Sequence, residues 1–154
     1  MCDNVTVFGG GCEKFGATAF VNPLESPKGV IIDDKLIEMA DGGCDFTFDC
    51  IGNVDVMRNT LEACHKGWGS SIIICVAPTG KEICTRLFQL ITGRLWRGVA
   101  FGGVKGRSQL AGIIEDYMVG KLKVDEFARK PLEQIKEAFE DMHTGDCIRA
   151  VVNM

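Results

Sequence analysis

The sequence predicts an α/β fold built on a doubly wound parallel sheet. Short β-like runs alternate with helical patterns along the 154 residues, an alternation typical of a parallel sheet covered by helices on both faces. Glycine-rich segments follow several of the predicted strands, where a sheet of this kind binds its ligand. With 46% hydrophobic residues, a chain of this length can bury one core. We therefore expect a single compact domain.

The elements can be assigned in chain order. The clearest unit is a strand at 45–51, a helix with one apolar stripe and a buried strand at 71–77; the stripe consists of Val54, Met57, Leu61 and Cys64. The remaining expected elements are strands at 5–8, 19–22, 95–101 and 147–152, and helices at 31–40, 87–92, 108–119 and from Pro131 to about Met142. The sequence contains no internal repeat and no low-complexity linker.

Charge and hydropathy exclude several classes of partner. The formal net charge is -4, the isoelectric point is about 5.2, and no run of Lys and Arg exceeds two residues, so we expect no nucleic-acid partner. No apolar stretch is long enough to span a membrane, and the first residues lack signal-peptide features. We expect a cytoplasmic protein with no membrane partner.

The cysteines and histidines do not predict a metal site. The eight cysteines lack paired Cys-x-x-Cys spacing and mostly lie in apolar runs, which predicts free buried thiols. His65 and His143 each lie near a predicted helix end, where a cation complements the helix dipole, and we prefer that interpretation to a metal ligand.

The first strand ends in a glycine-rich turn. Gly9 and Gly11 follow Val5 to Phe8 as in the phosphate loop of a dinucleotide-binding fold, but Lys14 occupies the position of the last glycine of the fingerprint. A plain turn explains the glycines equally well. Other glycine pairs also suit turns, and three acidic residues suit helix caps or solvated loops: Asp41, Asp45 and Asp49. Hydrolase, kinase and metalloprotease motifs are absent from the sequence.

Several long stretches of the sequence are more specific than a shared hydrophobic pattern. They resemble the class III alcohol dehydrogenases, the glutathione-dependent formaldehyde dehydrogenase branch of the zinc-containing alcohol dehydrogenases, almost continuously over 13–152. The stretches are 13–23, 41–53, 61–69, 85–94, 96–107 and 138–145. The resemblance implies a Rossmann-like domain, NAD as cofactor, zinc in the intact family, and oxidation of S-(hydroxymethyl)glutathione and primary alcohols.

The resemblance also implies cofactor contacts. Backbone groups of Ile74, Val99 and Phe101 would hold the nicotinamide carboxamide, Ile51 would lie along the adenine, and Arg149 would reach the pyrophosphate. From the residues alone, core packing explains the apolar ones, and an exposed charge at a sheet edge explains Arg149. The full set of expected cofactor-binding residues is Gly9, Gly11, Ile51, Ile74, Cys75, Val76, Val99, Phe101 and Arg149.

Departures from the family weaken the expected activity. No residue matches the family's zinc ligands, so we assign no catalytic and no metal residue. Only ten residues separate Phe8 from Ala19, which omits a helix, a strand and the acidic residue that would bind the ribose. The sheet must close that gap or expose an edge. In addition, Cys75 stands where the family has a glycine beside the nicotinamide. We therefore expect residues 1–154 to form a partial NAD-binding domain with a C-terminal segment, without the zinc domain and with NAD binding weak or lost.

Three functional hypotheses remain open. The first is a truncated oxidoreductase with little or no activity by itself. The second is a non-catalytic interaction module that dimerises through Leu95–Phe101 with itself or with a full-length subunit. The third is that another polypeptide supplies the catalytic half.

Overall fold

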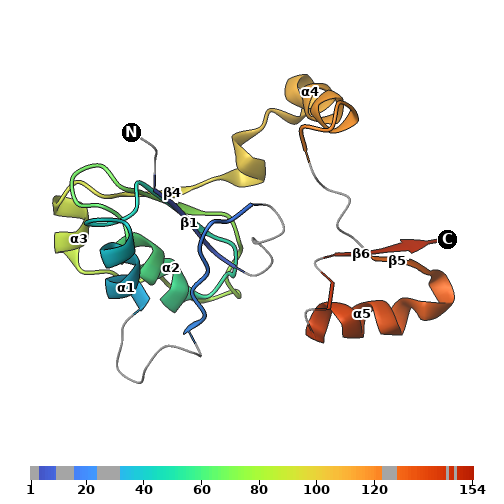
Figure 1. Ribbon diagram of the computed structural model, residues 1–154, viewed down its shortest axis with the longest axis horizontal. Coiled ribbons are helices and arrows are strands. Elements are labelled where there is room, and N and C mark those ends of the chain that lie inside the picture. The colour runs from blue at the N-terminus through green and yellow to red at the C-terminus, as the bar shows by residue number, and fades with distance from the viewer. Residues whose placement is uncertain (1–3, 10–15, 24–31, 123–127, 145, 148) are drawn as a thin grey trace. The chain divides into compact units, whose positions relative to one another are not determined.

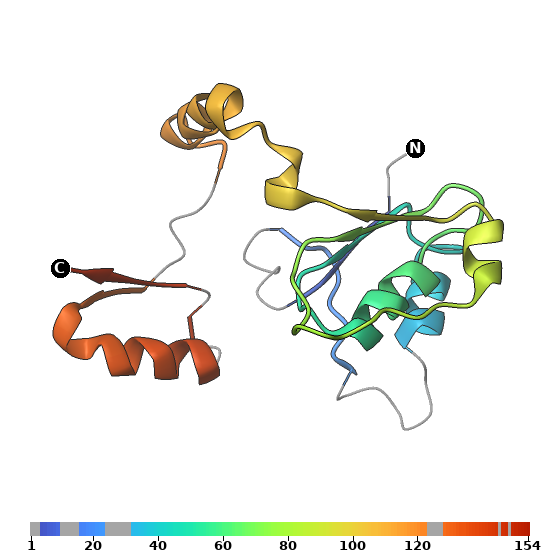
Figure 2. The ribbon, with the colours of Figure 1, turned by 180° about the vertical axis from the view of Figure 1, so that it is seen from behind.

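The computed structural model describes residues 4–9, 16–23, 32–122, 128–144, 146–147 and 149–154, and it divides into two compact units, Met1–Val104 and Lys105–Met154 (Figures 1 and 2). The first unit contains β1 (Val5–Phe8), α1 (Ile32–Met39), β2 (Phe46–Asp49), α2 (Val54–Glu62), β3 (Ser70–Ile73), α3 (Leu87–Ile91), β4 (Leu95–Gly98) and the 3-10 segment η3 (Ala100–Gly103). The second contains α4 (Gly106–Met118), β5 (Ala128–Pro131), the 3-10 segment η4 (Leu132–Gln134), α5 (Ile135–Thr144) and β6 (Ala150–Asn153).

A four-stranded parallel sheet organises the first unit. Its strand order is β1-β2-β3-β4, and the register aligns Phe8, Asp49, Ile73 and Gly98 at the last position of each strand. Helices α1 and α2 lie together on one side of this sheet in both views (Figures 1 and 2). The α/β fold class predicted from the sequence is confirmed.

The core lies between α2 and the middle of the sheet. Met57 and Leu61 of α2 are buried, as the apolar stripe predicted, but the sheet offers them polar neighbours. The Thr47 hydroxyl donates to the Thr60 carbonyl oxygen at 2.8 Å, and the Thr60 and Ser71 hydroxyls lie 2.8 Å apart. Each of these three buried hydroxyls therefore has a partner, which removes most of the cost of burying it.

One edge of the sheet is β1. Residues 19–22 form no strand, so the strand predicted there is wrong, and among the described residues β1 pairs with β2 alone. A strand forms only where a neighbouring strand can pair with its backbone groups, and here Phe20 stays exposed. Of the two outcomes expected for the omitted strand, the described part of the chain shows the exposed edge.

The second unit is a βαβ arrangement of its own. β5 and β6 pair in parallel, with α5 as the crossover between them. The helix expected to start at Pro131 is displaced: Pro131 ends β5, and α5 begins only at Ile135. Lys130 of β5 pairs with Asp141 of α5 at 2.6 Å. The strand β5 was not predicted, because its sequence Ala-Arg-Lys-Pro carries no apolar alternation.

Two other expectations need correction. The strand expected at 95–101 ends at Gly98, and the chain then turns through η3. None of the six cysteines whose structure is described forms a disulfide, but only Cys44 and Cys64 are buried, whereas Cys50 and Cys84 are exposed. Burial raises the pKa of the Cys64 thiol to about 11, which keeps it protonated and unreactive.

Candidate functional site

The candidate cofactor site is the edge of the sheet at which the four parallel strands end. Because the last residues of the strands are in register, the residues that follow them meet at this edge. Seven expected site residues occupy it: Gly9 after β1, Ile51 after β2, Ile74, Cys75 and Val76 after β3, and Val99 and Phe101 after β4.

Asp49 holds the loops of this edge together. It is fully buried at the end of β2, where its carboxylate accepts hydrogen bonds from the backbone N–H groups of Ile51 and Gly52, both at 3.3 Å. Its backbone carbonyl accepts from the N–H groups of Ile74 and Cys75, at 3.1 and 3.3 Å. The expectation of a cap or solvated loop residue at Asp49 is therefore wrong, because the carboxylate is used inside the fold.

At the same edge, the backbones of the loops that follow β2 and β3 lie close together. Gly52 has φ +82°, and a Cβ at this position would lie 2.8 Å from the carbonyl oxygen of Val76. Any side chain there would separate the loops that follow β2 and β3. Next to it, the Asn53 Oδ1 accepts from the N–H groups of Asp55 and Val56 and so caps the start of α2 at this edge.

Apolar side chains remain exposed at this edge. The exposed fractions are 53% for Ile51, 47% for Ile74, 92% for Val76 and 70% for Phe101. Core packing, the alternative for Ile51 and Ile74, does not account for such exposure. Exposed apolar groups beside backbone donors and acceptors suit a flat heterocyclic base, so the base contacts expected for NAD fit these residues.

Phe101 is also strained. Its backbone adopts φ +49° and ψ +41°, the left-handed region, which is uncommon for a residue other than glycine. Such conformations concentrate at binding and switch sites. The position of Phe101 immediately after β4 makes it part of the candidate site for a physical reason independent of the family resemblance.

Two expected residues are not among the described residues of the first unit. Gly11 lies outside the described residues, so its phosphate-loop role stays a prediction. Arg149 belongs to the second unit, where it is exposed and its carbonyl accepts from the Ala128 N–H at 2.8 Å. Its contact with a pyrophosphate also stays a prediction.

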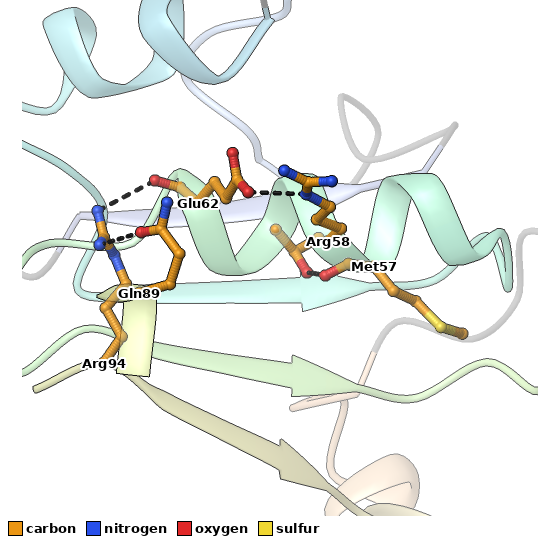
Figure 3. A network of polar contacts seen from close by, with 6 residues as sticks. Met57, Arg58, Glu62, Gln89 and Arg94 are labelled. Carbon is orange, nitrogen blue, oxygen red and sulfur yellow. Dashed lines mark hydrogen bonds and ion pairs between the residues drawn. The ribbon is translucent and has the colours of Figure 1, made fainter. Parts of the chain in front are cut away.

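A network of polar contacts lies at the opposite end of the sheet, where the strands begin (Figure 3). Arg94 is buried just before β4, and its guanidinium donates to the carbonyl oxygens of Cys64 at 2.8 Å and Glu62 at 3.3 Å, and to the side chain of Gln89. Burial lowers the pKa of Arg94 from its ordinary value. The sequence did not single out Arg94, because a buried arginine before a strand has no periodic signal.

The described residues include no group of three or more His, Cys, Asp or Glu side chains that could hold a metal ion. His65 instead stacks on Trp68, with ring centroids 3.6 Å apart. No helix among the same residues has the length and hydropathy to cross a membrane.

Comparison with known proteins decides the family. The sequence pattern named "Zinc-binding dehydrogenase" matches residues 11–116. The chain belongs to this family. It is 70% identical over 144 residues to the S-(hydroxymethyl)glutathione dehydrogenase of Candida maltosa and 62% identical over 144 residues to that of Saccharomyces cerevisiae. Over 155 residues it is 56% identical to the alcohol dehydrogenase class-3 of Dictyostelium discoideum. The resemblance to the class III branch is confirmed.

These relatives are much longer than the chain. The match covers 92% of this chain and 38% of the Candida maltosa protein, and 99% of this chain and 41% of the Dictyostelium discoideum protein. The chain thus spans about two fifths of the length of the curated relatives that it matches.

Solved structures of the family support the fold. An alcohol dehydrogenase zinc-binding domain protein from Burkholderia ambifaria matches with a TM-score of 0.85 at 18% identity, covering 99% of this chain and 48% of that one. The benzyl alcohol dehydrogenase of Acinetobacter calcoaceticus matches with a TM-score of 0.86 at 16% identity, covering 99% and 49%. The Rossmann-like fold predicted for this chain is confirmed.

Proposed function

We propose that this chain is the cofactor-binding part of an S-(hydroxymethyl)glutathione dehydrogenase, and that by itself it binds NAD weakly and has little or no activity. The identity of 70% to the Candida maltosa enzyme over 92% of the chain carries the proposal. NAD would accept a hydride from the alcohol carbon. The family's zinc ligands have no match in this sequence, and without that Lewis acid the alcohol keeps its high pKa. Cytoplasmic location is part of the same proposal.

The geometry of the strand ends supports cofactor binding. Ile51 and Val76 offer exposed apolar contacts to the base rings, while Val99 and Phe101 place backbone groups beside them. Asp49 holds the loops after β2 and β3 in place without a ligand. A site that is ordered before binding loses less conformational entropy on binding, so some affinity for NAD should survive.

Calorimetric titration of the monodisperse 154-residue chain with NAD tests this proposal. We expect saturable binding, several-fold weaker in Ile51→Ser and unchanged in Met39→Ser, which removes an equally exposed apolar side chain from the end of α1, away from the strand ends. With zinc and S-(hydroxymethyl)glutathione added, we expect no NADH above background. The absence of a heat of binding at millimolar NAD would overturn the proposed NAD binding. Turnover comparable to that of the Saccharomyces cerevisiae relative would overturn the proposed lack of activity.

The alternative function is an interaction module, and the edge of β4 favours it. The N–H groups of Leu95 and Val99 donate to Gly69 and Ile73 on the β3 side. Since successive residues of a strand alternate their hydrogen-bonding direction, Trp96 and Gly98 direct their N–H groups away from β3. β4 is the last strand of the sheet in the described part of the chain, so these donors can pair with a second subunit.

Gly98 offers a matched pair of variants for this alternative. Gly98→Pro removes the outward N–H, whereas Gly98→Ala keeps it and places a Cβ where no atom lies within 4 Å. Proline at Val99 would instead break the bond to Ile73 inside the sheet. We expect co-elution of the wild type and Gly98→Ala with the Saccharomyces cerevisiae relative, and its loss in Gly98→Pro. If the wild type does not co-elute, the module hypothesis is wrong.

A further inference from the structure

A hollow lies away from the strand ends, on the helical side of the first unit. Its volume is about 340 Å³, and its walls come from α1, the end of α2, α3 and the residue before β4; they are Asp33, Asp34, Ile37, Glu62, Lys66, Arg86, Phe88, Gln89 and Arg94. Glu62, Lys66 and Arg94 precede the starts of β3 and β4. None of the residues assigned to the cofactor site lines the hollow.

Asp33 makes this hollow unusual. It is only 5% exposed, and its Oδ1 is buried without a hydrogen-bond partner among the described residues. Burial, together with the nearby carboxylates of Glu62 and Asp34, raises the pKa of Asp33 to about 6, although Arg58 acts in the opposite direction. The ion pair of Arg58 is with Glu62, whose Oε1 lies 2.8 Å from the Arg58 Nε. A buried carboxylate without a partner is costly in any fold, and a cationic ligand would remove that cost.

The lining of the hollow also includes cations that have no carboxylate partner among the described residues. Among the described residues, Lys66 and Arg86 form no ion pair. Arg94 is already engaged with backbone and side-chain oxygens, as Figure 3 shows for its contacts with Glu62 and Gln89. The whole lining of the hollow therefore contains three carboxylates and three cations, with Ile37 and Phe88 adding apolar surface. The carboxylates would repel a polyanion, and the cations would repel a polycation.

We propose that this hollow binds a free α-amino acid with an apolar side chain. The ammonium group would lie on Asp33, the carboxylate would lie against Lys66 and Arg86, and the side chain would lie on Ile37 and Phe88. This assignment gives the buried carboxylate of Asp33 a cationic partner and gives Lys66 and Arg86 an anionic one. It does not depend on NAD binding or on dehydrogenase activity, because the two sites share no residue.

Titration of the ¹⁵N-labelled 154-residue chain with L-leucine tests the proposal. Saturable shifts in the amide signals of Asp33, Glu62 and Gln89 at millimolar ligand are expected. Two analogues each lack one charge: 4-methylpentanoate has no ammonium group, and 3-methylbutylamine has no carboxylate. Each lost charge-assisted contact should weaken binding by about tenfold. An analogue that binds as tightly as leucine refutes the zwitterion assignment, and the absence of saturable shifts refutes the site.

Variants give an independent check. Asp33→Asn should weaken leucine binding by about tenfold or more, because it removes the counter-charge of the ammonium group. Asp55→Asn is the matched control, since it neutralises an exposed first-turn aspartate of α2 that does not line the hollow. Unchanged leucine affinity in Asp33→Asn, in a chain whose spectrum is otherwise native, overturns the proposal.

Discussion

Neutralising Asp33 should stabilise the folded chain at neutral pH. The pKa of Asp33 rises from an ordinary 3.8 to about 6, and because one pKa unit corresponds to about 1.4 kcal/mol, the ionised carboxylate costs about 3 kcal/mol. Solvent in the adjoining hollow screens part of this cost. The carboxylate also interacts favourably with the start of α1, by about 0.5 kcal/mol. We expect Asp33→Asn to raise the free energy of unfolding by about 1–2 kcal/mol at pH 7.

The pH dependence has a definite sign. Because the folded-state pKa of Asp33 is raised, the folded state binds more protons than the unfolded state between about pH 4 and 6. The free energy of unfolding contributed by this group therefore falls as pH rises through that window. Asp45 acts oppositely, since hydrogen bonds from the Asn4 N–H and the Trp68 indole lower its pKa. It does so in wild type and variant alike, so the difference between them isolates Asp33.

Urea denaturation of both chains at several pH values measures this difference. The advantage of Asp33→Asn over the wild type should be largest at pH 7 and should shrink as pH falls from 6 to 4. Asp34→Asn, an exposed neighbour on the same helix turn, should show a much smaller effect. A variant that is less stable than the wild type at pH 7, or an advantage independent of pH, refutes the reasoning.

Three further changes test the packing by the same urea assay. Leu61→Ala should lower the free energy of unfolding by about 2–5 kcal/mol, because Leu61 is fully buried; an equal loss in exposed Leu110→Ala would contradict this. Asn53→Ala should lose about 1 kcal/mol with the cap of α2, and Asn53→Ser should restore most of it. Arg94→Lys should cost about 2 kcal/mol by losing the guanidinium fork, whereas exposed Arg97→Lys should be nearly neutral.

The sequence predicted the elements whose signal is local. The apolar stripe of α2 lies where periodicity placed it, because burial against one face imposes that spacing. The strand expected at 71–77 exists as β3, but it covers only Ser70–Ile73. The strand expected at 19–22 failed for the opposite reason, because a strand also needs a partner and the sequence does not state which strand is adjacent. β5 was missed because pairing with β6, and not its own composition, makes it a strand.

The candidate site was predictable only through the family resemblance. Ile51, Ile74 and Val99 carry ordinary β-like side chains, and no pattern marks them as binding residues. Asp49 could not be recognised from sequence, because its role depends on backbone N–H groups from two loops that meet only in the folded sheet. Asp33 was missed likewise, since an aspartate in the first turn of a helix is normally exposed and favourable there.

The two ends of the sheet differ in how their polar groups are satisfied, and this difference separates their functions. At the strand ends, Asp49 satisfies the loop backbone and leaves apolar side chains exposed, an arrangement that suits flat rings and tolerates an absent ligand. At the hollow near the strand starts, one carboxylate oxygen of Asp33 stays buried without a hydrogen-bond partner among the described residues, a cost that the proposed ligand would reduce. A ligand that binds only the folded state stabilises it. Leucine should therefore raise the thermal midpoint of the wild type and not that of Asp33→Asn, while NAD should stabilise both alike.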